Sequence, residues 1–235
     1  MIEFELERRN PAEVLAACGI FNLSSSDGQA KAQFTPEGTF RLETRYDFEE
    51  LLSHLRSDRI EVAGDLSSAT ISGFQVNWWM REGRAFKLWA GQVNPDNLIR
   101  ELARACDRLR EKSNGYKLLS ASLPLTKRLG ADPRSSWATL DIGYSPDKQG
   151  MGAVHTWPFT ELLAMIGLQT FLPREIPRER ERRRYDYNLW ESMLPLLPAR
   201  LAFAGVSIPC PVRRYRFTVG KSGSYRVFNF SELEG

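Results

Sequence analysis

Short β-prone runs joined by glycine-containing turns are the feature that most constrains how this 235-residue chain can fold. Residues 30–34 and 39–46 flank a Pro-Glu-Gly turn, and residues 213–219 and 224–230 flank a Gly-Lys-Ser-Gly turn. Each pair is typical of a β-hairpin, in which the two strands are antiparallel. Such pairs outnumber strand–helix–strand units, so the sequence disfavours a doubly wound parallel sheet.

Helical patterns lie between these runs. Asn10-Pro11 is a typical N-cap and first helical residue before the apolar run 12–23, and Pro158 opens a second apolar helix over 159–168. Further helical patterns occur at residues 48–56, about 95–112, and 193–204, the last interrupted by Pro195 and Pro198. We therefore predict an α+β fold, mainly antiparallel sheet with helices packed on its faces. No apolar run approaches the roughly 20 residues that cross a bilayer, so no transmembrane segment and no membrane partner is expected.

The least regular region is 113–136, where we expect a long loop with one short helix around Thr126. It supplies the best candidate for a boundary, between an N-terminal α+β lobe (1–112) and a C-terminal basic lobe (113–235). One continuous globular domain is the alternative, because no change in composition marks the junction.

Three scattered cysteines, Cys18, Cys106 and Cys210, each lie among apolar residues. With no secretory pattern at the N-terminus, they indicate reduced, buried thiols and a cytoplasmic protein. No CxxC or HxxxH pair occurs, so neither a metal site nor another cofactor is expected.

Basic residues are concentrated in the C-terminal third. Residues 173–226 hold twelve Lys and Arg against five Asp and Glu, a net charge of +7, within a chain whose net charge is +3. Such segregation favours a polyanionic partner, although a solvated basic surface without a partner has the same composition. Arginine rather than lysine dominates, which suits bidentate phosphate contact. The candidate residues are Arg182, Arg183, Arg184, Arg214, Arg216 and Lys221. The two-residue period of a strand places Arg214 and Arg216 on one face and Tyr215 and Phe217 on the other.

A polar loop at 145–156 is the candidate for reading nucleotide bases. A β-prone run (137–142) precedes it and the proline-started helix follows, so a rigid frame would present Ser145, Lys148 and Gln149. A tight connection whose glycines serve only turn geometry is the alternative. Three further cations precede this unit and are candidate phosphate contacts: Lys127, Arg128 and Arg134.

Several segments, in order, resemble one CRISPR-associated family. They are R-R-N-P-A-E-V-L-A-A-C-G-I-F-N-L (8–23), F-Q-V-N-W-W-M with F-K-L-W-A-G-Q (74–92), D-I-G-Y-S-P-D (141–147), E-L-L-A-M-I-G-L-Q-T-F-L-P (161–173) and Y-N-L-W-E-S-M-L-P-L-L-P-A-R-L-A (187–202). Together they resemble the small Dpsyh-subtype protein of type I-U, now I-G, loci. Ile20-Phe21 departs conservatively from the family's glycine-leucine-leucine run.

The resemblance implies a non-catalytic subunit, a reduced large subunit of the crRNA-guided surveillance complex (Cascade). Its partners would be crRNA, target DNA, the backbone and cap subunits, and a helicase-nuclease recruited after target binding. Its role would be to recognise the protospacer-adjacent motif of the target. Two alternatives stay open. One is an endoribonuclease that processes the crRNA precursor, with His155 as general base and Lys148 as phosphate-stabilising cation. The other is a purely structural assembly subunit.

Overall fold

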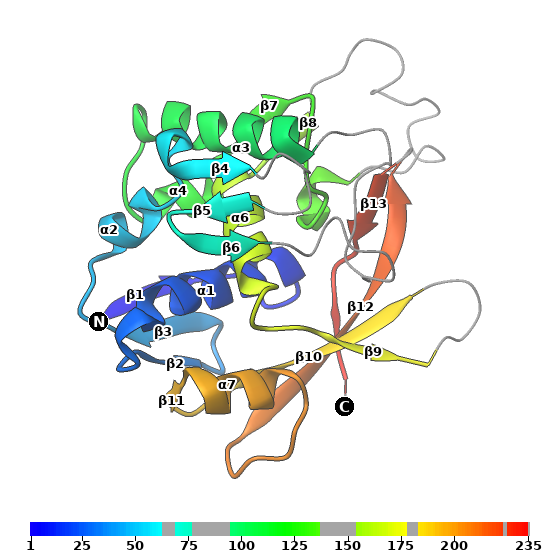
Figure 1. The fold of residues 1–235 in the computed structure, drawn as a ribbon. Coiled ribbons are helices and arrows are strands. Elements are labelled where there is room, and N and C mark those ends of the chain that lie inside the picture. Colours follow the sequence, from blue (N-terminus) through cyan, green and yellow to red (C-terminus); the bar gives the residue numbers. More distant parts are fainter. Residues whose placement is uncertain (63–68, 77–94, 137–153, 178–182, 223–224, 235) are drawn as a thin grey trace.

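The computed structural model describes residues 1–62, 69–76, 95–136, 154–177, 183–222 and 225–234 (Figure 1). The β-prone run 137–142 lies outside these residues, as do residues 77–92 of the tryptophan-containing segment 74–92. All described strand pairings are antiparallel, and helices pack beside the sheets, so the α+β prediction is confirmed. Within the described residues, no helix has the length and apolar character needed to span a membrane.

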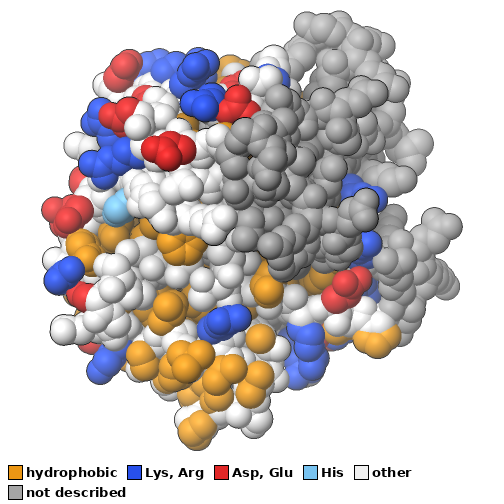
Figure 2. All heavy atoms as spheres, in the orientation of Figure 1, with side chains coloured by type: hydrophobic (Ala, Val, Ile, Leu, Met, Phe, Trp, Pro, Cys, Tyr) orange, Lys and Arg blue, Asp and Glu red, His pale blue; other side chains and the backbone are white. Residues whose placement is uncertain are grey.

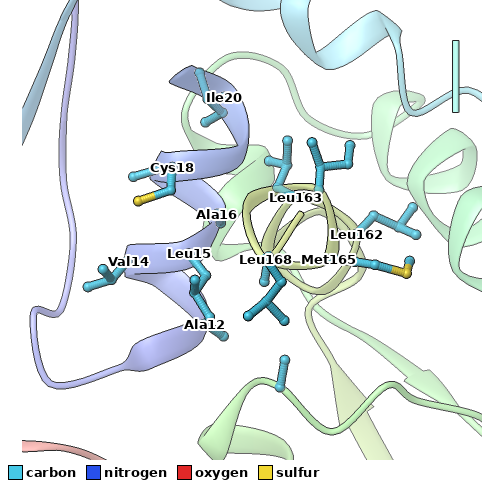
Figure 3. Packing of buried hydrophobic residues seen from close by; sticks show 14 of the residues in the cluster. Ala12, Val14, Leu15, Ala16, Cys18, Ile20, Leu162, Leu163, Met165 and Leu168 are labelled. Atoms are coloured by element: carbon cyan, nitrogen blue, oxygen red, sulfur yellow. The ribbon is translucent and has the colours of Figure 1, made fainter. Parts of the chain in front are cut away.

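Two buried helices, α1 (Pro11–Ser24) and α6 (Pro158–Gly167), cross at the centre of the molecule (Figures 1 and 3). The Asn10 side chain caps α1 by accepting hydrogen bonds from the backbone N–H groups of Ala12 and Glu13. The crossing depends on two glycines: a Cβ on Gly19 would lie 2.1 Å from the Leu163 carbonyl oxygen, and one on Gly167 would lie 2.1 Å from the Leu15 carbonyl oxygen. The backbones of the two helices are therefore in direct contact.

The first sheet has the strand order β1-β3-β2-β11. It is formed by β1 (Ile2–Glu5), β3 (Thr39–Glu43), β2 (Lys31–Phe34) and the short β11 (Leu194–Pro195). The alternating apolar residues of β1 to β3 face α1 and the core, as the period of a strand requires. β11 comes from the far end of the sequence, so the sheet joins both halves of the chain.

The second sheet has the order β13-β12-β10-β9, with β14 also paired to β12. It comprises β13 (Tyr225–Phe228), β12 (Val212–Ser222), β10 (Arg184–Trp190), β9 (Arg174–Ile176) and β14 (Glu232–Leu233). The C-terminal hairpin is confirmed, with Ser222 paired to Tyr225 at its tip.

In the part of the chain that the structure describes, two small sheets and four further helices complete the fold. The sheets are β4 (Ile60–Val62), β5 (Ala69–Ile71) and β6 (Phe74–Val76), and β7 (Leu123–Leu125) with β8 (Val154–Thr156). The helices are α2 (Phe48–Ser53), α3 (Pro95–Arg110), α4 (Lys117–Ser120) and α7 (Leu196–Phe203). Short 3-10 turns occupy Ser25–Asp27, Ser57–Arg59 and Pro133–Ser135.

In the irregular region 113–136, the expected position of the short helix around Thr126 was wrong. The short helix lies at Lys117–Ser120, and the residues just before Thr126 form β7. Pro124 lacks a backbone N–H and cannot continue a helix, but it fits a two-stranded ladder opposite His155.

Contacts cross the expected boundary between residues 112 and 113 throughout the core. α1 packs against α6, β2 pairs with β11, and the Trp190 indole N–H donates to the Ala32 carbonyl at 2.7 Å. Near the C-terminus, the Ser231 backbone N–H donates to the Arg9 carbonyl at 2.7 Å.

Candidate nucleic-acid interface

Four arginines lie on one face of the β9–β10–β12 sheet, and we call this surface the arginine face: Arg174, Arg184, Arg214 and Arg216. The strand register places Arg174, Asp186 and Arg216 side by side in one row. Arg184 and Arg214 are each two residues from that row along β10 and β12, so they point to the same side. The expected placement of Arg214 and Arg216 on one face is confirmed, the candidate Arg184 lies on the same face, and Arg174 was not among the candidates from sequence.

The opposite face of the same sheet explains this placement. Tyr185, Tyr187, Tyr215 and Phe217 alternate with the polar residues and are at most 3% exposed. Their rings stack across the strands, with centroids 5.5 Å apart for Tyr185 and Phe217 and 5.6 Å apart for Tyr187 and Tyr215. This aromatic layer packs in the core and leaves the arginines on the outer side, as predicted for residues 214–217.

Asp186 lies buried at the centre of the arginine face, only 2% exposed. Its carboxylate binds Arg216 through two hydrogen bonds, Nε to Oδ1 at 2.8 Å and Nη2 to Oδ2 at 3.1 Å. Arg174 approaches the same carboxylate at 3.7 Å, and Glu234 binds Arg216 at 2.9 Å. Arg216 therefore has a structural role in the sheet, because two carboxylates already neutralise it.

Arg174 and Arg214 are the members of the arginine face with exposed side chains. Arg174 retains 52% of its side-chain exposure beside Asp186, and Arg214 is exposed on β12. The exposed side chains of Arg174 and Arg214 can reach an anion in solvent, Arg174 from a position 3.7 Å from the Asp186 carboxylate.

A second basic surface, the α3 groove, surrounds Lys127. The groove has a volume of ≈ 660 Å³ and is lined by Asn97, Arg100, Glu101, Arg104, Asp107, Arg108 and Lys127. Arg100, Arg104 and Arg108 recur every four residues and so form one stripe on the helix. Charged side chains gather over α3 at the top of the view in Figure 2. Among the described residues, no ion pair neutralises Arg104 or Arg108.

Lys127 itself lies 3.7 Å from Glu101, on the wall of the groove. Lys127 was among the candidates from sequence, but the arginine stripe was not. Arginine at every fourth residue of an expected helix is a pattern that the sequence alone could have revealed.

Arg128 and Arg134 take part in an internal polar network instead of a surface. Arg128 is 1% exposed, and its charge lies near the buried carboxyl of Glu161. Arg134 binds Asp132 through Nε at 3.0 Å and Glu13 through Nη1 at 2.9 Å, and its guanidinium lies 4.2 Å from the Trp157 ring centroid. Because Arg128 is buried, its side chain is not accessible to a phosphate backbone. The Arg134 guanidinium is already paired with the carboxylates of Asp132 and Glu13.

Glu161 on α6 anchors this network. It accepts hydrogen bonds from the backbone N–H groups of Gly130 at 3.1 Å and Asp132 at 2.9 Å. Burial is the main reason that its pKa is raised from 4.5 to about 7; the hydrogen bond from the Asp132 backbone N–H and the charge of Arg128 oppose this rise, and the Asp132 carboxylate adds to it. Burial also raises the pKa of Glu13, which the Glu7 backbone N–H and Arg134 partly offset.

The remaining candidates fall in three places. Ser145, Lys148, Gln149 and Arg182 lie outside the described residues. Lys221 belongs to β12, and only its backbone is described, paired with Arg226. Arg183 is half-buried, and its carbonyl accepts the Val219 backbone N–H at 3.1 Å.

His155, the candidate general base, is exposed on β8 with Nδ1 3.1 Å from the Ser122 hydroxyl. The described residues contain no group of three or more His, Cys, Asp or Glu side chains placed to hold a metal ion. Cys18, Cys106 and Cys210 are all free cysteines; the first two are buried and the third is half-buried.

Comparisons of the chain with protein families, with curated proteins and with solved structures find no match.

Proposed function

We propose that the protein is a non-catalytic, nucleic-acid-binding subunit of a type I CRISPR effector complex, acting in the cytoplasm. The observation that carries the nucleic-acid role is the arginine face, where Arg174 and Arg214 present exposed guanidinium groups on a rigid sheet. Arginine on a rigid scaffold suits bidentate contact with phosphate oxygens. The α3 groove adds a second set of cations. The assignment to a CRISPR complex rests on the ordered sequence segments that resemble the small type I-G subunit.

In this proposal the phosphate contacts position the duplex, and the 145–156 loop reads the protospacer-adjacent motif. Base readout needs donors and acceptors that reach base edges, which Ser145, Lys148 and Gln149 supply. Guide RNA pairing supplies the remaining sequence specificity, and the helicase-nuclease acts after target binding. The crRNA, target DNA and the backbone and cap subunits are the partners.

The salt dependence of DNA binding tests the phosphate role. Replacing Arg174 and Arg214 with alanine should weaken binding to duplexes of any sequence and reduce the slope of log K against log salt by about 0.9 for each phosphate that the variant no longer neutralises. Arg104→Ala with Arg108→Ala tests the α3 groove in the same way. Arg41→Ala is the control, because Arg41 is half-buried in the other large sheet and is paired with Glu3 at 3.1 Å. Unchanged slopes in both double variants would reject the proposal.

Motif reading has its own test. Lys148→Ala with Gln149→Ala should lower discrimination between motif and non-motif duplexes by about 1–3 kcal/mol for each base that the loop no longer reads, while non-specific binding is retained. Discrimination that survives this double variant would show that another segment reads the motif.

One observation favours the assembly alternative. Exposed apolar side chains cluster on and after α7, at the bottom of Figure 2: Leu197, Leu201, Val206 and Val212. A protein that binds neither duplex DNA nor crRNA, yet enters the complex, would establish that alternative. Cleavage of labelled precursor RNA that His155→Ala abolishes would establish the endoribonuclease.

A further inference from the structure

The outer edge of β1 is open among the described residues. The Leu6 backbone N–H donates to the Gly38 carbonyl at 3.0 Å, next to the β1–β3 ladder. Because hydrogen-bonding direction alternates along a strand, the backbone groups of Ile2 and Phe4 also point to β3, whereas those of Glu3 and Glu5 point away. In the described part of the chain, no hydrogen bond from elsewhere reaches the backbone of Glu3 or Glu5. An edge of this kind can pair with another extended strand.

An apolar pocket lies beside this edge. Its volume is ≈ 390 Å³, and its apolar walls come from Phe4 and Leu6 of the β1 segment, Ala16 of α1, and Tyr116 and Leu119 around α4. Phe4 and Leu6 share one face of the β1 segment. A strand added to β1 would direct every second side chain to that same face, next to Phe4 and into the pocket.

The polar groups in the pocket wall are already paired with one another. Arg134 and Glu13 are 2.9 Å apart, and Glu13 also accepts the Glu7 backbone N–H at 2.7 Å. Lys117 lies at the rim and is exposed. The interior therefore suits an aliphatic or aromatic side chain rather than an ion.

The opposite face of β1 is acidic. Glu3, Glu5 and Glu7 recur every second residue with exposed side chains, and only Glu3 has a cross-strand arginine, Arg41 at 3.1 Å. A second copy of β1 in the same position would oppose glutamate to glutamate, which destabilises a strand pair. Lysine or arginine at alternate positions of an added strand would instead complement this row.

We propose that the β1 edge and its pocket bind an extended segment of a partner protein in which apolar and basic residues alternate. The segment adds to the sheet as a strand beside β1, its apolar side chains enter the pocket, and its basic side chains face Glu5 and Glu7. This inference concerns a protein partner and does not depend on the nucleic-acid role proposed above.

A short fluorescent peptide of alternating valine and lysine is the probe, with full-length protein and fluorescence anisotropy as the readout. We expect saturable binding and slowed hydrogen exchange at the Glu3 and Glu5 amides. Ser120→Trp should reduce affinity about tenfold or more by filling the pocket. Ser120 is an exposed residue of the pocket lining, and Ser207→Trp is the matched control, since Ser207 is also exposed but lies after α7.

Two further comparisons separate strand addition from general charge attraction. Glu5→Pro removes an outward N–H and should abolish binding, whereas Glu5→Thr removes only the charge and should weaken binding several-fold. A peptide N-methylated on its pairing edge tests the same hydrogen bonds without changing the protein, should Glu5→Pro fail to fold. Absence of peptide binding, equal binding of the N-methylated peptide, or equal affinity of Ser120→Trp and Ser207→Trp would overturn the proposal. Dimerisation through β1 would also overturn it, because it would identify a second copy as the occupant.

Discussion

Glu161 is a fully buried carboxyl that holds the loop before the Pro133–Ser135 turn against α6. Its pKa rises from 4.5 to about 7 on folding, so the folded state binds the proton more tightly than the unfolded chain. The stability that this proton contributes is complete below about pH 4.5 and is lost as the pH rises through about 7.

We expect the free energy of unfolding to fall by on the order of 3 kcal/mol between pH 4.5 and 7.5 because of Glu161. Urea titrations across this range check it. Glu161→Gln should flatten the decline, and Glu43→Gln, which changes an exposed carboxyl, should not. A decline of equal steepness in wild type and Glu161→Gln would contradict the assignment.

Asp186 allows stability and binding to be separated at one residue. Asp186→Asn removes the buried charge that holds Arg216 and should destabilise the fold by about 3 kcal/mol. The same change adds one net positive charge to the arginine face, so duplex DNA should bind more tightly and with a steeper salt dependence. Thermal unfolding and binding titrations below the unfolding temperature measure the two effects. Weaker DNA binding by folded Asp186→Asn would remove the arginine face from the interface.

At the scale of elements, the α1–α6 crossing depends on the absence of side chains. Gly19→Ala would place a methyl group 2.1 Å from a backbone oxygen, which a side-chain rotation cannot relieve. We expect it to lower the free energy of unfolding by about 3 kcal/mol or more. Gly28→Ala is the comparison: its φ is +71° and its Cβ would meet nothing within 4 Å, so the cost should be only the backbone penalty of about 1 kcal/mol. Equal destabilisation by the two variants would show that the helices can separate.

Elements that depend on local patterns were predictable from sequence. The Asn10-Pro11 start of α1 and the alternation of Arg214 and Arg216 with Tyr215 and Phe217 are both present, because capping and strand period act within a few residues. Long-range partners were not predictable. Nothing local shows that Leu194 and Pro195 pair with β2, or that Arg128 is buried near Glu161.

The candidate site also combines features that local sequence predicts with long-range contacts that it does not. The side of the sheet on which the arginines lie followed from sequence, but Asp186 in a Tyr-Asp-Tyr run gave no local sign that it would be buried between Arg174 and Arg216. That role is set by cross-strand register, which depends on pairing between segments about 30 residues apart.

At the scale of the whole molecule, the two halves of the chain complete each other's core. Residues 1–112 supply α1 and the three long strands of the first sheet, whereas α6 and β11, which cover and extend them, come from residues 113–235. The stacked rings of Phe171 and Trp190, with centroids 5.7 Å apart, lie against Phe21 of α1. Separating the halves would expose these apolar faces to water.

We therefore expect the full chain to unfold in one cooperative transition, with equal calorimetric and van't Hoff enthalpies. A fragment of residues 1–112 should lack a cooperative melt, because α1 is apolar on nearly all sides and cannot bury its glycine face without α6. A fragment of residues 113–235 should behave likewise, since α6 is buried along its whole length in the intact chain. Mixing the two should restore near-ultraviolet circular dichroism from buried aromatic residues such as Trp190. Two resolved calorimetric transitions, with residues 1–112 alone reproducing one of them, would instead establish independent lobes divided near residue 112.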